Sequence, residues 1–473
     1  MHFGRMAKNM KGYLIIILIL ASLVSFQTMA NNPFFPLKMF DRCYKIFTNS
    51  FPDQKNVLRI KVSQGLISYE QGCMDLLNQT NLTSNKTVQG DLSISILRTF
   101  QAFHSSWFPS FLTFMTDDVP QTFDIVELES PALFVTKSLF DDEFNFSQIV
   151  VGDNDFEGIR SNSNKPDYYI GSRISPKISI SENPPLHGKG NYSPWNPHFN
   201  DRGPLIGIRK IEKGRDILPS HVNNLFYPQL FEEPIDIHQS AGGGLMGTNP
   251  YLIFNLGRSL GDRANGGSSI PRKFVQQIFS DVLCRDLPVL NVEDTEPFLE
   301  EDKVVSWSNN HSCMSCHVTM DHFAGLVRNA ELVFSNEDGK ASAHIKFHPT
   351  KYIIEDQKPF YRNDKDYFQS KPDGRLIFRD FDNNLVNIYV KNLNEVGVEF
   401  SKRRDMYVCA TIRYLEFLTG TKVSMAQLRN NYLEKKLSPE ESEIIKIADK
   451  FKRADNLKSL ISDILKSSFF TQN

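Results

Sequence analysis

The sequence lacks an excess of charge of either sign. Its 53 lysines and arginines are matched by 55 aspartates and glutamates, so the formal net charge is only -2 at neutral pH. Proteins that bind nucleic acid or an anionic lipid surface usually carry a basic patch or stripe. We therefore expect neither nucleic acid nor an anionic lipid surface as a partner.

The amino terminus lacks an apolar run long enough for a membrane span. The run from Tyr13 to about Phe26 is shorter than the ~20 residues that a spanning helix needs. Three basic residues precede it, Arg5, Lys8 and Lys11, and small residues suitable for cleavage follow at 28–30. This pattern predicts a signal peptide over residues 1–30, export to the periplasm and no stable membrane anchor after cleavage. An uncleaved segment that anchors the chain in the membrane is the alternative.

The sequence also lacks a recognisable catalytic constellation. It contains no evident Ser-His-Asp arrangement, no paired-carboxylate motif and no second metal signature, so we name no catalytic residue. Three histidines of the loop-rich middle of the chain, His187, His198 and His238, are the candidates for contact with a substrate.

The sequence does contain one informative short motif, the pentapeptide Cys-Met-Ser-Cys-His at 313–317. Attachment of haem c requires two thiols for thioether bonds to the porphyrin and an adjacent imidazole for the iron. On a helix, positions i, i+3 and i+4 share one face, which suits attachment along one edge of the cofactor. The motif predicts covalent haem c, with Cys313 and Cys316 as the attachment residues and His317 as an axial iron ligand.

Two other interpretations of the pentapeptide stay open. Cysteine and histidine at this spacing also bind zinc, and although there is no second Cys-x-x-Cys, four histidines could complete a mixed site: His311, His322, His344 and His348. The two cysteines would otherwise form a disulfide or a redox-active Cys-x-x-Cys pair.

The ligand on the opposite side of the iron is a separate question. Met320 is one turn from His317 on the same helix, so it should lie on the proximal side of the haem. We favour Met406, and the other candidates are Met425, His322, His344 and His348. A methionine would raise the reduction potential, a second histidine would lower it, and an open position would permit binding of small molecules.

Four cysteines remain outside the pentapeptide: Cys43, Cys73, Cys284 and Cys409. An oxidising compartment favours their pairing, and four cysteines allow three connectivities. We expect Cys43 to pair with Cys73, and Cys284 with Cys409. Buried free thiols are the alternative.

The organisation of the 473 residues suggests two or three domains. A helical N-terminal domain is expected at 31–152. The connecting region at 153–233 is rich in Gly, Pro, Asn and Ser and is expected to consist of loops. Helical patterning returns at 234–473, which is the expected haem-binding domain. The predicted fold class is mainly α with small β hairpins. It combines a helical, cytochrome c-like domain with a helical, loop-rich N-terminal region.

Helix signals give local expectations. Helices are predicted from Ser68 to Leu77, from Ser130 to Leu139, from a cap at Ser269 with Pro271 in the first turn to before Pro288, from Arg404 to Thr419, after the capping box at Ser438, and along the apolar face of 457–465. Strands at 331–334 and 343–347 flank Asp338-Gly339 and predict a hairpin, and a further strand follows Gly374.

A glycine-rich segment at 242–247 has the literal G-x-G-x-x-G pattern. No clear apolar strand precedes it, so we do not expect nucleotide binding. Its glycines are better explained by a tight turn before a helix at Pro250 to Leu260.

Three stretches together resemble the planctomycete-type cytochrome c-like family: Asp281 to Pro288, Cys313 to Asp321, and Cys409 to Leu415 with Gly420. The segment from Leu457 to Phe470 also resembles the terminal helix of that family. The resemblance extends over Gly242 to Phe470, and more weakly over Cys43 to Leu77. The chain departs from the pattern at His322, where the family usually has proline, and at Gly325, one place later than expected. The resemblance implies a periplasmic haem protein and does not supply a reaction.

Two classes of function follow. In the first, a single haem passes electrons between partner proteins that the sequence does not identify. In the second, the chain is an oxidoreductase whose region 33–233 holds a substrate and whose haem accepts the electrons. Because an electron carrier needs only about a hundred residues, most of this chain must serve some other purpose, such as substrate binding, scaffolding or partner docking.

Overall fold

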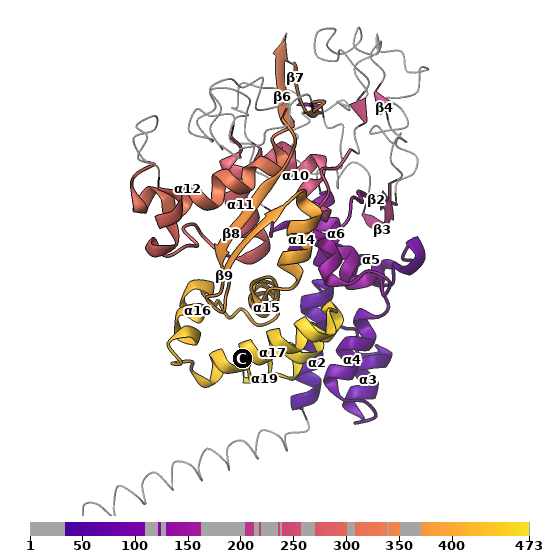
Figure 1. The fold of residues 1–473 in the computed structure, drawn as a ribbon. Coiled ribbons are helices and arrows are strands. Elements are labelled where there is room, and N and C mark those ends of the chain that lie inside the picture. Colours follow the sequence, from indigo (N-terminus) through magenta and orange to yellow (C-terminus); the bar gives the residue numbers. More distant parts are fainter. Residues whose placement is uncertain are drawn as a thin grey trace, which may run out of the picture. The chain divides into compact units, whose positions relative to one another are not determined.

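A computed structural model describes residues 34–108, 122–123, 129–161, 204–211, 217–218, 235–236, 239–256, 270–299, 308–337, 340–350 and 370–472. These residues form mainly helices with a few small sheets, as the sequence predicts (Figure 1). The signal peptide expected over residues 1–30 and the three loop-region histidines lie outside the described residues. Among the described residues, none of the helices is both long and apolar enough to cross a membrane.

The chain divides into two compact units, residues up to Gln79 and residues from Thr80 onward. The domain boundary expected at residue 152 falls within the second unit and stays a prediction. The helices after Thr80 pack with the carboxyl-terminal helices of the second unit: His104 bonds to Tyr414, and Ser147 bonds to Asp455. Sequence patterning could not reveal these contacts because about 310 residues separate the partners.

The first unit contains three helices, α2 (Phe35–Thr48), α3 (Val57–Ser63) and α4 (Tyr69–Leu77). Ser68 caps α4 by accepting a hydrogen bond from the backbone N–H of Gln71, as predicted. The core is buried on the facing sides of these helices and consists of Met39, Phe40, Phe47, Val62, Leu76, Leu77 and the disulfide Cys43–Cys73.

The helices of the second unit are α5 (Asp91–Ser105), α6 (Ser130–Phe140), α10 (Asn249–Asn255), α11 (Arg272–Leu283), α12 (His311–Ala324), α14 (Leu393–Ser401), α15 (Arg404–Thr419), α16 (Met425–Leu433), α17 (Pro439–Ala454), α18 (Leu457–Lys466) and α19 (Ser468–Gln472). Its short 3-10 helices are η1 (Thr83–Asn85), η2 (Phe146–Val150), η4 (Gly244–Gly247), η6 (Val292–Phe298) and η7 (Gly325–Val327).

The strands of the second unit form small separate sheets: β1 (Thr122–Phe123), β2 (Phe156–Arg160), β3 (Leu205–Lys210), β4 (Ile217–Leu218), β5 (Ile235–Asp236), β6 (Ala330–Glu337), β7 (Lys340–Phe347), β8 (Gly374–Arg379) and β9 (Leu385–Val390). The pairs β2–β3, β4–β5, β6–β7 and β8–β9 are antiparallel, and β1 adds to β7 in parallel. The hairpin predicted around Asp338-Gly339 is thus present and longer than expected, with Glu337 opposite Lys340.

The glycine-rich segment forms the tight turn that its composition predicts. Gly243 has a φ of 72°, which favours glycine, and η4 and α10 follow directly. The side-chain amide of Asn394 in α14 accepts hydrogen bonds from the backbone N–H groups of Gly152 and Gly243. The segment therefore serves to dock the backbone against α14.

An aromatic cluster joins the elements around α12. The cluster consists of Phe279 (α11), Phe323 (α12), Phe378 (β8) and Phe400 (α14). The rings of Phe279 and Phe400 contact each other and both other rings, with centroids 5.3–6.5 Å apart. All four side chains are fully buried. This cluster fixes α12 between α11 and β8, which places the pentapeptide in the fold.

Candidate functional site

The pentapeptide lies in the first two turns of α12. Asn310 caps this helix, because its side-chain oxygen accepts hydrogen bonds from the N–H groups of Ser312 and Cys313 at 2.9 and 3.3 Å. The cap makes residues 313–317 helical. Cys313, Cys316 and His317 therefore share one side of the helix, as the spacing predicts.

The opposite side of α12 anchors the helix in the core. Met314 and Val318 pack in a buried cluster with Leu290 and Ile377. The Thr319 hydroxyl donates to the carbonyl oxygen of Ile377 in β8 at 2.8 Å. In contrast, Cys313, Cys316, His317 and Met320 are only partly buried. Core contacts therefore hold α12 by its apolar side, and the two thiols and the imidazole lie on the accessible side.

His317 is oriented by a buried carboxylate. Its Nδ1 lies 3.0 Å from Oδ2 of Asp321, one turn further along α12, and the Asp321 side chain is 1% exposed. Arg272, at the start of α11, donates to both carboxylate oxygens of Asp321 at 2.5 and 3.1 Å. The two contacts with Arg272 hold the Asp321 side chain in place. With Nδ1 of His317 engaged by Asp321, the imidazole would bind a metal through Nε2.

The two thiols of the pentapeptide are not joined in a disulfide, whereas the four other cysteines are paired. Burial raises the pKa of the Cys316 thiol above its ordinary value. Redox-active cysteines usually have a lowered thiol pKa, so this environment does not favour the redox-pair interpretation.

The donor set fits haem c: two unpaired thiols and one oriented imidazole, on one partly exposed side of a helix that is fixed from behind.

Three of the histidines considered for a zinc site have other partners. Nδ1 of His311 bonds to the hydroxyl of Thr295, His322 bonds through Nδ1 to the carbonyl of Val318, and His348 bonds to Glu331. The side chain of His344, in β7, lies outside the described part. Within the described part of the chain, no group of three or more His, Cys, Asp or Glu side chains is placed to hold a metal ion.

The candidate distal ligands are distributed through the second unit. Met406 is 1% exposed and lies in the first turn of α15, a helix that packs mainly against α17 and α11. Met425 begins α16 and is also buried. The ring of His322 faces Phe298, and burial lowers its pKa. The segments that pack most closely on α12 are β8, η6 and α11, so the distal ligand stays a prediction.

The remaining cysteines form the two expected pairs. Cys43 is bonded to Cys73 within the first unit, and Cys284 is bonded to Cys409 in the second. The second bond links the carboxyl end of α11 to α15. It therefore connects the helix that carries Arg272 to the carboxyl-terminal helices.

Sequence reasoning assigned no role to Asp321 or Arg272. The spacing of four residues between His317 and Asp321 could have identified the first, because such pairs meet on a helix. No sequence signal identifies Arg272, which lies 49 residues before Asp321.

Comparison with known proteins gave no match: no family model, curated protein or solved structure is significantly similar to this chain.

Proposed function

We propose that this chain is an exported protein that carries one covalently attached haem c and transfers electrons. Cys313 and Cys316 form the two thioether bonds, and Nε2 of His317 coordinates the iron. The bound haem supplies a one-electron couple, and the protein supplies its position and its electrostatic environment.

The observation that carries this proposal is the geometry of α12. The three donor residues lie on its partly exposed side, and a buried carboxylate holds the imidazole in the orientation that iron coordination needs. Cys313, Cys316 and His317 would hold the cofactor on this partly exposed side of the helix, and the cofactor would supply the one-electron chemistry. The cytochrome c-like family resembled at 281–288, 313–321 and 409–415 supports the same proposal.

Asp321 has a defined electronic role in this proposal. A carboxylate that accepts a hydrogen bond from Nδ1 makes the imidazole a stronger electron donor. Stronger donation stabilises ferric over ferrous iron, so Asp321 lowers the reduction potential. Arg272 withdraws part of the carboxylate charge and moderates this effect.

Export to the periplasm is part of the proposal. The leader-like pattern over residues 1–30 supports it, as do the two disulfides, because disulfides persist in oxidising compartments. The redox partner is proposed only as a class, namely a protein that exchanges one electron with the haem.

The ferrous spectrum with and without carbon monoxide tests the electron-transfer assignment. We expect no change in the Soret band of the native protein, because a closed six-coordinate iron leaves no position for the gas. We expect a shift in Met406→Ala, where the distal ligand is lost. Met39→Ala is the matched control, since Met39 is similarly buried but belongs to the first unit.

A shift in the native protein would contradict the electron-transfer assignment and favour an open iron that binds small molecules. An unchanged spectrum in Met406→Ala would contradict the distal assignment alone. Met425→Ala then becomes the informative variant.

A further inference from the structure

A second site lies in the carboxyl-terminal half of the chain, at a pocket of about 480 Å³. Its walls come from the carboxyl end of α11, the middle of α15 and the first turn of α16. Cys284 of the second disulfide also lines it. The walls are therefore linked covalently, and the pocket does not involve α12.

The charged lining of this pocket is mostly basic. Three arginines line it, Arg285, Arg413 and Arg429, against one acidic residue, Asp286. Arg285 is neutralised by an ion pair with Asp405 at 2.6 Å. The charge that the pocket presents to a ligand therefore depends mainly on the guanidinium groups of Arg413 and Arg429.

Arg413 and Arg429 make their hydrogen bonds to oxygens that carry no formal charge. Arg413 donates to the backbone carbonyls of Asp281 and Ser280 at 2.7 and 3.2 Å. Arg429 donates to the carbonyl of Asp380 and to the side-chain amide of Asn383. The carboxyl of Asp281 is also near Arg413. Burial raises its pKa to about 6, so it is still mostly ionised at neutral pH and acts on Arg413 through space, without a direct hydrogen bond.

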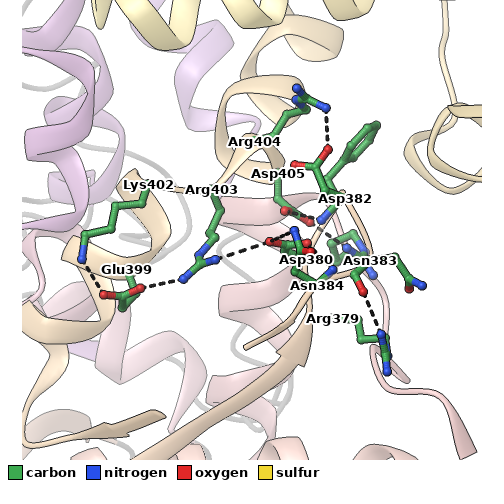
Figure 2. A network of polar contacts seen from close by, with 12 residues as sticks. Arg379, Asp380, Asp382, Asn383, Asn384, Glu399, Lys402, Arg403, Arg404 and Asp405 are labelled. Atoms are coloured by element: carbon green, nitrogen blue, oxygen red, sulfur yellow. Dashed lines mark hydrogen bonds and ion pairs between the residues drawn. The ribbon is translucent and has the colours of Figure 1, made fainter. Parts of the chain in front are cut away.

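The neighbouring network shows the usual arrangement for comparison. Figure 2 shows Arg403 between Asp380 and Glu399, and Arg404 against Asp382. Each of these guanidinium groups reaches a carboxylate directly. Arg413 and Arg429 do not, and burial lowers the pKa of Arg413 to about 10 and also lowers that of Arg429. Among the described residues, carboxylates therefore act on Arg413 and Arg429 only through space, and neither guanidinium has a direct carboxylate partner.

The first turn of α16 faces the same pocket. Ser424 caps this helix by accepting from the N–H of Gln427, and Met425 and Ala426 line the pocket. The amino end of a helix favours negative charge through its unpaired N–H groups and its dipole. Two arginines and a helix amino terminus therefore converge on one cavity.

We propose that this pocket binds a small oxyanion ligand, with a carboxylate or phosphate group held between Arg413, Arg429 and the first turn of α16. The planar guanidinium group suits these anions because it offers parallel N–H donors. The ligand would supply the direct anionic contact that neither arginine makes within the described protein. This inference does not depend on the haem.

Titration of the full chain with inorganic phosphate and with succinate, at constant ionic strength, tests the proposal. We expect saturable heat in calorimetry and a rise in Tm with at least one of these anions. Binding of phosphate alone or of succinate alone would identify the class of ligand. Absence of saturable binding by both would overturn the proposal.

Two substitutions in the first turn of α16 provide a matched pair. Ala426→Asp places a carboxylate in the pocket, whereas Gln427→Asp places the same charge on an exposed neighbour that does not line it. Both substitutions suit the first turn of a helix, so both variants should fold. We expect Ala426→Asp to weaken anion binding by about tenfold or more and Gln427→Asp to change it much less. Equal weakening in the two variants would contradict the proposed location.

Substitution of Arg429, one of the pocket arginines, gives a second comparison. Arg429→Gln should also weaken binding about tenfold, while Arg403→Gln, which removes a nearby guanidinium outside the pocket, should not. Unchanged affinity in a folded Arg429→Gln would count against the proposal.

Discussion

The hydrogen bonds of His104 fix its protonation state. The Thr136 hydroxyl donates to the carbonyl of Ala132, so it must accept from Nδ1–H of His104 at 2.9 Å. Nε2 then accepts from the Tyr414 hydroxyl at 2.7 Å. Both ring nitrogens are satisfied in the neutral form, and burial lowers the pKa of His104 to about 3.

This shift makes stability depend on pH. The unfolded chain takes up a proton near the ordinary histidine pKa of about 6.5, and the folded chain does so only near 3. The contribution is therefore complete above pH 6.5 and is lost as the pH falls. Between pH 6 and pH 4 we expect the free energy of unfolding to fall by up to about 1.4 kcal/mol per pH unit from this residue.

Urea unfolding at several pH values in this interval, for the native protein and for His104→Gln, measures the effect. The variant should be less stable at pH 7 and should have a flatter pH dependence. Parallel curves for the two proteins would show that another group is responsible.

Asp321→Asn tests the role of the carboxylate beside His317. An amide is a weaker acceptor than a carboxylate, so ferric iron loses part of its stabilisation. If about 1 kcal/mol is lost, the reduction potential rises by roughly 40–50 mV, since 59 mV corresponds to a factor of ten for one electron. Redox titration followed in the visible spectrum measures the shift.

Asp294→Asn is the control for that measurement. Asp294 also forms a two-point ion pair, with Arg379, and lies in η6, which packs on α12. Its substitution should leave the potential nearly unchanged. Equal shifts in the two variants would mean that the loss of one negative charge near α12, and not the contact with His317, changes the reduction potential.

At the scale of elements, helix ends that carry a local sequence signal, such as a capping residue or a terminal glycine, were predicted correctly. The helix Arg404–Thr419 ends at Gly420, whose φ of 78° requires the left-handed conformation. The capping box at Ser438 begins α17, and the five apolar residues of 457–465 are fully buried. The docking of α14 was not predictable, because it depends on residues more than 240 positions earlier.

Gly397 in α14 is the clearest test of that docking. A Cβ at this position would lie 1.6 Å from the carbonyl oxygen of Val150, so the two backbones could not keep their approach. We expect Gly397→Ala to destabilise the protein by about 1–3 kcal/mol or more, as overpacking does. Thermal unfolding measures this directly.

The neighbouring residue supplies the control. Val398 is 40% exposed, so Val398→Ala should cost well under 1 kcal/mol. Similar losses in both variants would contradict the close approach of α14 to residue 150.

At the scale of the whole molecule, the cysteine pairs agree with the expected connectivity, whereas the division into units does not follow composition. The sequence changes in character near residue 152, but the compact units divide at Gln79. The reason is that α5 and η2 find their partners in α15 and α17, through contacts such as Phe103 with Phe417 and Phe146 with Phe451. Composition cannot reveal such distant pairing. The three pocket arginines illustrate the same limit, since they come from the loop after α11, from α15 and from α16.

The two disulfides should differ in their contribution to stability. The Cys284–Cys409 bond closes a separation of 125 residues and the Cys43–Cys73 bond one of 30. By loop-closure entropy, the first is worth about 5 kcal/mol and the second about 3.6. Denaturant unfolding of the two double Cys→Ala variants should show the larger loss for 284 and 409. The reverse order would contradict the entropic account.

The central claim is a covalent bond between haem and the thiols of Cys313 and Cys316, and the most direct measurement is the mass of the proteolytic peptide that contains both. After expression with working haem-attachment machinery, we predict this peptide at its own mass plus one haem, and at its own mass alone in Cys313→Ser/Cys316→Ser. An unmodified peptide from a colourless native protein would contradict the account.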